Sequence, residues 1–162
     1  MGRTGTTRRR LFVVTGAVTA GALTGCSGGS SGESAERLAA DAAAEEAAGR
    51  RRLAGASGAL RDRYDATIAR HPGLGARLSG LRASVSEHVT ALGGATRTAE
   101  PVRVPSDEPS ALASLADAER RTSDTHGAAL QSTGDPEFAR LLASVAAAGA
   151  AHAYLLTNGD SR

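Results

Sequence analysis

Apolar residues recur at helical spacing from residue 35 to the end of the chain, and no run alternates in the manner of a β-strand. This pattern predicts a first helix over residues 36–71, which Pro72 and Gly73 end. One face of this helix collects Leu53, Ser57, Leu60, Tyr64 and Ile68. A second helix follows and ends at Gly93 and Gly94. Its stripe is the most regular in the chain and consists of Leu74, Leu78, Leu81, Val85, His88 and Leu92.

Two more helices are predicted in the second half of the chain. Pro109 suits the first turn of the third helix, where a missing N–H costs nothing, and Gly134 ends that helix. Asp135 is expected to cap the fourth helix, which ends at Asn158. The inward face of the third helix is expected to hold Leu112, Leu115, Glu119, Thr122, His126 and Ala129. The stripe of the fourth helix consists of Phe138, Leu141, Val145, Gly149, His152 and Leu156, with Leu142 and Leu155 at its edges.

The connections predict how the helices are ordered in space. Residues 95–108 contain Pro101 and Pro105 and no helical stripe. When extended they span up to ~45 Å, whereas a helix of about 20 residues is ~30 Å long. This segment is therefore long enough to run the length of a bundle between the second and third helices, while the connections near Pro72 and Gly134 are short. The sequence predicts an all-α four-helix bundle with one long crossover, the connection pattern of ferritin-like bundles.

The N-terminal residues carry the pattern of an exported lipoprotein. Arg8 and Arg9 lie in a basic cluster that matches a twin-arginine signal, although such a cluster serves the general secretory route as well. The uncharged residues 11–23 follow, a run shorter than the ~20 apolar residues that a membrane-spanning helix requires. The run ends in a match to a bacterial lipobox, which consists of Leu23, Thr24, Gly25 and Cys26. In a lipobox, the signal peptide is cleaved before the cysteine, and the cysteine then carries a lipid.

This interpretation divides the chain into three parts. Residues 1–25 are expected to be a signal peptide, residues 26–34 a flexible linker and residues 35–162 the helical domain. Four of the 19 basic residues precede Cys26, which leaves 15 Arg against 17 Asp and Glu, a formal charge of −2. With no basic surplus, no Trp, two Tyr and two Phe, this part lacks the charge and the stacking rings that nucleic-acid binding uses. Cys26 is the single cysteine, so no internal disulfide forms.

Several short motifs of the helical part resemble a known family. They comprise residues 63–66, 71–72, 81–83, 118–121, 141–145 and 151–153. On these motifs, the chain resembles the ferritin-like-domain lipoproteins of high-GC Gram-positive bacteria over most of its length after Leu53. The resemblance implies a ferritin-like bundle in the cell envelope, and it implies no established activity.

The residues that would bind metal in such a bundle are incomplete. Metal-binding ferritins combine a Glu on one helix with a Glu-x-x-His motif on another, twice over. Here Gly149 precedes His152 by three residues and Val85 precedes His88 by three, so both motifs lack the carboxylate. One inward carboxylate among three imidazoles is too few for two hard cations, and no cofactor is expected. The candidates for a single zinc or copper ion are His152, Glu119, His88 and His126.

Counting ~1.5 Å per residue from the end of the bundle near Pro72 gives each inward polar residue a level. With the crossover, Tyr64, Glu119 and His152 are expected to form one polar layer. His88 and His126 are expected to form a second layer, nearer the opposite end. A bundle without the crossover would lower His152 to the level of His88, so contact between these two rings is expected only without the crossover.

The sequence contains no convincing catalytic constellation, and the protein is therefore not expected to be an enzyme. The leading hypothesis is a lipid-anchored helical bundle on the outer face of the cytoplasmic membrane. It would meet the membrane through its lipid and bind a protein or small ligand that the sequence does not identify. The alternative is a metal-binding or redox-active ferritin-like protein. A third hypothesis, an adaptor that dimerises through exposed Ala faces, stays open.

Overall fold

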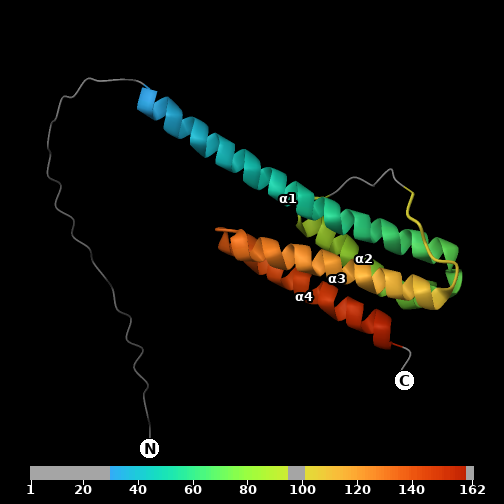
Figure 1. The fold of residues 1–162 in the computed structure, drawn as a ribbon. Helices are drawn as coiled ribbons and strands as arrows, with labels where there is room; N and C mark the ends of the chain where they lie inside the picture. Colours follow the sequence, from blue (N-terminus) through green and yellow to red (C-terminus); the bar gives the residue numbers. More distant parts are fainter. Residues whose placement is uncertain (1–29, 95–100, 160–162) are drawn as a thin grey trace, which may run out of the picture.

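The computed structural model describes residues 30–94 and 101–159, which form four α-helices, one short 3-10 helix and no strand. The elements are α1 (Ser30–Arg70), η1 (Pro72–Leu74), α2 (Gly75–Ala91), α3 (Glu108–Ser132) and α4 (Pro136–Asn158), as Figure 1 shows. The four α-helices pack together, so the predicted all-α class is confirmed. Several residues of the predicted export signal lie outside the described residues, namely Arg8, Arg9, Leu23, Thr24, Gly25 and Cys26.

The helix ends follow the sequence signals. The carboxylate of Asp107 caps α3 by accepting from the backbone N–H of Ser110 at 2.9 Å. Asp135 caps α4 in the same way and accepts from the N–H of Glu137 at 2.9 Å. Gly93 and Gly94 follow α2 with φ values of 103° and 81°. Glycine adopts this left-handed conformation without steric cost, and the N–H of Gly94 can therefore return to the carbonyl of Val89 at 2.8 Å.

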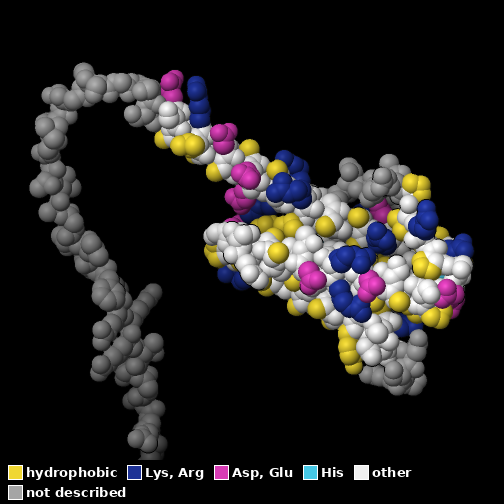
Figure 2. Space-filling view, viewed as in Figure 1, with side chains coloured by type: hydrophobic (Ala, Val, Ile, Leu, Met, Phe, Trp, Pro, Cys, Tyr) yellow, Lys and Arg dark blue, Asp and Glu magenta, His cyan; other side chains and the backbone are white. Residues whose placement is uncertain are grey.

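α1 is longer than the sequence pattern predicted. It begins at Ser30 rather than near residue 36, so the second part of the expected linker is helical. The Ala- and Glu-rich sequence that follows has high helix propensity and explains this extension. Side chains from Gly32 to Glu46 are exposed, and Leu38 is 71% exposed. This half of α1 projects beyond the bundle (Figure 1), and Figure 2 shows acidic and basic side chains along it.

Contacts at the two ends of the bundle fix the direction of each helix. His71, just after α1, donates from Nε2 to the carbonyl of Pro105 at 2.9 Å, so α3 begins beside the end of α1. At the opposite end, Asp135 follows α3 and accepts from Arg50 of α1 at 2.7 Å. Therefore α3 runs antiparallel to α1. Since Leu92 at the end of α2 packs near Leu53 and Phe138, the segment between α2 and α3 joins opposite ends of the bundle.

The helices form two closely packed pairs, α1 with α2 and α3 with α4, which meet mainly through α1 and α3. Arg82 of α2 donates to both carboxylate oxygens of Asp65 on α1, at 2.8 and 3.1 Å. Arg77 near the start of α2 donates to the carbonyl of Leu156 near the end of α4 at 3.1 Å. The larger apolar cluster comprises Leu60, Tyr64, Leu74, Leu78, Val85, Leu112, Leu115, Ala116, Ala118 and Leu156. The smaller cluster comprises Leu53, Ala54, Leu92, Phe138 and Leu142.

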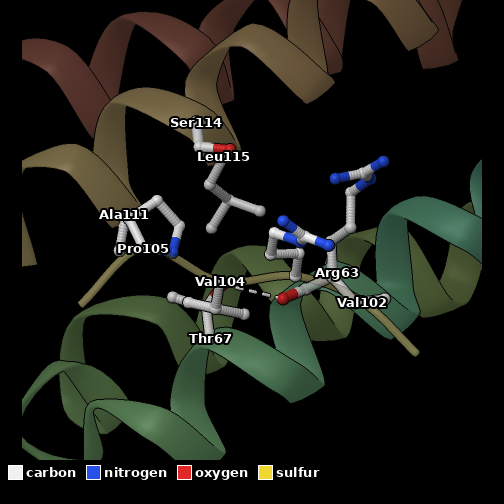
Figure 3. Close-up of a pocket in the computed structure, with 9 residues that line it drawn as sticks. Arg63, Thr67, Val102, Val104, Pro105, Ala111, Ser114 and Leu115 are labelled. Atoms are coloured by element: carbon white, nitrogen blue, oxygen red, sulfur yellow. Dashed lines mark hydrogen bonds between the residues drawn. The ribbon is translucent and has the colours of Figure 1, made fainter.

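The chain just before α3 is packed against the bundle. Val102, Val104 and Pro105 lie against α1 and α3 near Thr67 and Leu115 (Figure 3). The cavity that remains between them is only about 10 Å³, roughly the smallest space that holds one water molecule. This packing explains why the start of α3 is held at the η1 end of the bundle.

Candidate functional site

A buried polar layer crosses the bundle between α1, α3 and α4. Tyr64, Glu119 and His152 are 0%, 1% and 8% exposed. The Tyr64 hydroxyl donates to Oε1 of Glu119 at 2.6 Å, and Nδ1 of His152 lies 3.0 Å from the same oxygen. The predicted first polar layer is therefore confirmed. Because one carboxylate oxygen accepts from both neighbours, these three side chains satisfy one another inside an apolar core.

The layer favours a protonated tyrosine and an ordered imidazole. Burial, together with the negative charge of Glu119, raises the pKa of Tyr64 far above its ordinary value. The phenol therefore stays protonated, and its O–H donates a hydrogen bond to the carboxylate of Glu119. Since a carboxylate only accepts, Nδ1 of His152 carries the proton in their hydrogen bond. The two hydrogen bonds to Oε1 of Glu119 therefore fix the orientation of the phenol and of the imidazole in the core.

Gly149 explains the missing carboxylate of the Glu-x-x-His pattern. A Cβ atom at Gly149 would lie 3.3 Å from Oε2 of Glu119 and 3.3 Å from Cβ of Ser123. The glycine therefore leaves room for the carboxylate that α3 supplies. The sequence revealed that a glutamate was absent at this position, but only the structure shows that Glu119 fills the space.

His88 lies against this layer, so its predicted level along the bundle relative to His152 was wrong. Its ring stacks on that of His152, with centroids 6.2 Å apart and planes 15° apart. We expected such contact only without a crossover, and that expectation was wrong. The count assumed that α4 ends level with Pro72, but Arg77 reaches the carbonyl of Leu156, so α4 ends beside the first turns of α2. This offset moves His152 toward His88, while the helix directions stay as described above.

His126, which was expected in a second layer with His88, forms its own hydrogen bonds with residues of α1 and α3. His126 is 0% exposed, and its Nδ1 donates to the carbonyl of Thr122 at 2.7 Å. Its Nε2 lies 3.3 Å from the hydroxyl of Ser57, which supplies the proton of this second bond. Burial lowers the pKa values of both His126 and His88, the latter also through the neighbouring His152. Both rings are therefore favoured in the neutral form.

The donor atoms do not fit a ferritin-type metal centre. Within residues 30–94 and 101–159, no group of three or more His, Cys, Asp or Glu side chains could hold a metal ion. Oε1 of Glu119 is shared by Tyr64 and His152, and Gly149 leaves no second carboxylate. Of the weak candidates, Glu119, His152 and His88 lie together, whereas His126 is bonded elsewhere.

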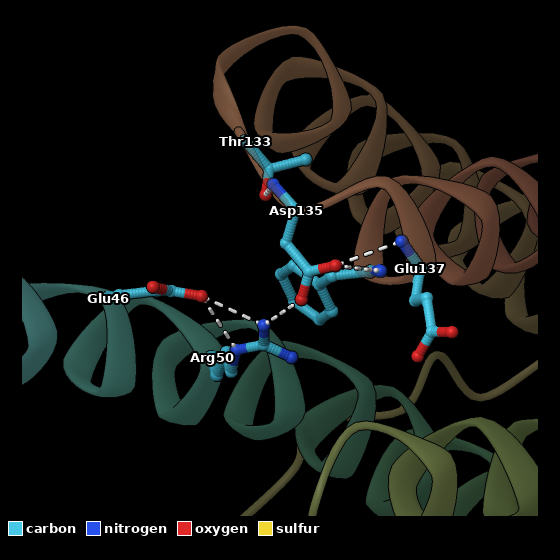
Figure 4. A network of polar contacts seen from close by, with 6 residues as sticks. Glu46, Arg50, Thr133, Asp135 and Glu137 are labelled. Atoms are coloured by element: carbon cyan, nitrogen blue, oxygen red, sulfur yellow. Dashed lines mark hydrogen bonds and ion pairs between the residues drawn. The ribbon is translucent and has the colours of Figure 1, made fainter. Parts of the chain in front are cut away.

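An open groove lies where α1 leaves the bundle, next to the turn between α3 and α4. Its volume is about 900 Å³, and Leu53 and Phe138 supply apolar parts of its lining. Arg50 binds Glu46 at 2.8 Å and Asp135 at 2.7 Å, and its guanidinium lies 3.9 Å from the centre of the Phe138 ring (Figure 4). Sequence reasoning identified Asp135 as a helix cap but missed the groove, because no local pattern reveals which helix lies opposite.

Comparisons of the chain with protein-family models, with curated proteins and with solved structures give no match. The class of protein is therefore defined by the fold and the site alone. It is an all-helical bundle with a hydrogen-bonded polar layer in its core, a projecting helical arm and an open groove at the base of that arm.

Proposed function

We propose that this protein is a lipid-anchored helical bundle on the outer face of the cytoplasmic membrane, and that it acts by binding rather than by catalysis. The observation that carries the proposal is the position of Cys26, the single cysteine, shortly before the exposed arm of α1. From Ser30 onward, the chain that follows such an anchored residue would reach the bundle as a helix. At ~1.5 Å per residue, the exposed part from Gly32 to Glu46 would hold the bundle roughly 20 Å from the anchor.

The arrangement of polar groups supports binding over catalysis. The inward side chains Tyr64, Glu119 and His152 bond to one another, and none is presented in a cleft. The groove beside Arg50 instead offers a concave surface with apolar and charged parts, as ligand sites commonly do. The resemblance to ferritin-like lipoproteins and the order of short, long and short connections support a ferritin-like ancestry for this bundle.

Metabolic labelling with a clickable fatty acid tests the anchor. Wild-type protein expressed in its native kind of host should take up the label, and the Cys26→Ser variant should not. An arginine-to-lysine change at Arg8 and Arg9 is the matched control for the export route, because it keeps the charge of the cluster. Unlabelled wild-type protein, recovered intact from membranes, would refute the proposal.

The alternative is a metal-binding or redox-active ferritin-like protein, which the proximity of Glu119, His152 and His88 favours. Metal analysis of protein purified without a His-tag separates the two functions. The proposed binding function predicts less than one metal ion per chain, with no change in His152→Ala. Stoichiometric zinc or copper that is lost in His152→Ala would establish the alternative.

A further inference from the structure

A cleft with a basic lining opens between α1 and α3, partway along the bundle. Its volume is about 200 Å³, and the charged side chains among the described residues that line it are Arg63 of α1 and Arg121 of α3, which we call the cleft arginines. Positions 56, 59 and 63 recur at three- and four-residue steps, so this part of α1 presents one side to the cleft. Three alanines explain the hollow, because their methyl groups leave space between the helices: Ala56, Ala59 and Ala118.

No carboxylate neutralises the cleft arginines, although other arginines beside them in the sequence are paired. Arg61 binds Asp62 at 2.9 Å, and Arg120 binds Asp117 at 2.8 Å. Among the described residues, the guanidinium groups of the cleft arginines take part in no ion pair and no hydrogen bond. Both side chains are exposed. The cleft therefore presents two accessible positive charges, while the carboxylates next to them in the sequence are bound to other arginines.

A third unpaired arginine lies next to the cleft. Arg103, in the chain before α3, lines the small cavity near Val102 together with Arg63, so Arg63 borders both this cavity and the cleft (Figure 3). Among the described residues, Arg103 also has no ion pair and no hydrogen bond of its side chain. Figure 2 shows basic side chains gathered over the middle of the bundle. Like charges in one region repel each other, and a bound anion would remove this repulsion.

We propose that the cleft binds a phosphate group, held between the guanidinium groups of Arg63 and Arg121. A guanidinium is a planar fork that donates two parallel hydrogen bonds to phosphate or carboxylate oxygens. The two oxygens of a carboxylate lie in one plane and satisfy one fork, whereas the tetrahedral oxygens of a phosphate can face arginines on both walls of the cleft. Thr122 adds a hydroxyl to the lining, and among the described residues this hydroxyl has no hydrogen-bond partner.

The rest of the lining suits the carbon atoms next to a phosphate, because it consists mainly of alanine methyl groups and the side chain of Leu60. A free phosphate ester and the headgroup of an anionic lipid share this chemistry. The groove at the base of the arm is a different kind of surface, since Glu45 and Glu46 line it. Phosphate binding in the cleft goes beyond the function proposed above and requires neither the anchor at Cys26 nor a ligand in that groove.

Isothermal titration calorimetry with inorganic phosphate tests the site in the full chain. The Cys26→Ser background removes the lipid and the native thiol, and low ionic strength is used because salt at 0.1 M screens exposed charges beyond about 10 Å. Arg63→Gln and Arg121→Gln should each weaken binding by about tenfold or more, since each removes charge-assisted hydrogen bonds. Arg140→Gln is the matched control: it removes the same charge from an exposed position of α4 and should weaken binding by less than about twofold.

Arg63→Lys separates a site built on the guanidinium fork from a diffuse positive field. Lysine keeps the charge but donates from a single point, so it cannot form the two parallel hydrogen bonds, and binding should weaken by roughly fivefold or more. Equal affinities of Arg63→Lys and the parent would overturn the proposal, as would equal losses in Arg63→Gln and Arg140→Gln. Circular dichroism confirms that each variant remains folded.

Cosedimentation with phosphatidylglycerol vesicles distinguishes the two sources of the phosphate. Every variant shares residues 1–29 apart from the common Cys26→Ser change, so differences between variants report on the cleft. Vesicle binding that is lost in Arg63→Gln but kept in Arg140→Gln would assign the cleft to a lipid headgroup. Vesicle binding that Arg63→Gln leaves unchanged, together with binding of inorganic phosphate, would assign it to a free phosphate ester. No binding of phosphate at about 10 mM, combined with no effect of Arg63→Gln on vesicle binding, would overturn the proposal.

Discussion

Replacing Tyr64 by phenylalanine removes one oxygen atom from the buried polar layer and leaves its ring in place. Tyr64 is 0% exposed, and its hydroxyl donates to Glu119 at 2.6 Å. A hydrogen bond to a charged group contributes about 1.5–3 kcal/mol to stability. The change creates little cavity, so the lost bond dominates. We therefore expect the free energy of unfolding to fall by about 2 kcal/mol, which corresponds to a Tm decrease of roughly 4–8 °C for a chain of this size.

Urea unfolding followed by circular dichroism at neutral pH measures this loss in the Cys26→Ser background. Tyr154→Phe is the matched control, because it removes the same oxygen from a ring that is 67% exposed. It should change the free energy of unfolding by less than about 0.5 kcal/mol. Equal effects of the two substitutions would refute the reasoning, since the hydroxyl of Tyr64 would then contribute no more in the core than a hydroxyl in water.

A double-mutant cycle assigns the effect to the bonded pair. Glu119→Gln keeps the shape of the side chain and removes its charge. If the phenol stabilises the carboxylate, Tyr64→Phe should cost less in the Glu119→Gln background than in the parent, with a coupling energy of about 1 kcal/mol or more. Additive costs would mean that the two groups, although 2.6 Å apart, do not stabilise each other.

Three further substitutions or conditions follow from the structure. Burial lowers the pKa values of His88 and His126 below the ordinary 6.5; the unfolded chain then binds more protons, and the free energy of unfolding should fall as the pH drops below about 6.5. Gly149→Glu, which restores the Glu-x-x-His pattern, should destabilise the bundle by about 3 kcal/mol or more and bind no metal, because it forces a second carboxylate against Glu119. Asp135→Ala should lower the free energy of unfolding through loss of the α4 cap, and Asp135→Asn should lower it less.

Each of these expectations has its own control. Stability that stays constant from pH 7.5 to pH 5 would contradict the histidine prediction, and His126→Gln should reduce the slope. Ala113→Glu introduces a carboxylate at an exposed position of α3 and should be nearly neutral in the same thermal melts as Gly149→Glu. Equal costs for Asp135→Ala and Asp135→Asn would show that the salt bridge to Arg50, and not the helix cap, is what Asp135 contributes.

The sequence by itself determined which residues are helical and where most helices end. Caps and breakers act within a few residues, so Pro109, Asp135 and Gly93 could be assigned without knowledge of the fold. The inward stripes were equally local, and most of their members are buried. The start of α1 escaped this reasoning because a Gly/Ser-rich stretch was interpreted as a linker, whereas the Ala-rich helix behind it extends through its second part, back to Ser30.

Only the tertiary structure decided how far neighbouring helices are offset along each other, and therefore that His88 also meets the polar layer. The layer of Tyr64, Glu119 and His152 could be predicted, because a level along the bundle follows from helix rise and chain direction. The contact of His88 with His152 could not, because it depends on how far α4 is offset along α2, which is set where Arg77 meets the end of α4. Helical periodicity specifies the face on which a residue lies, but the offset between two helices arises from the packing of all their side chains together.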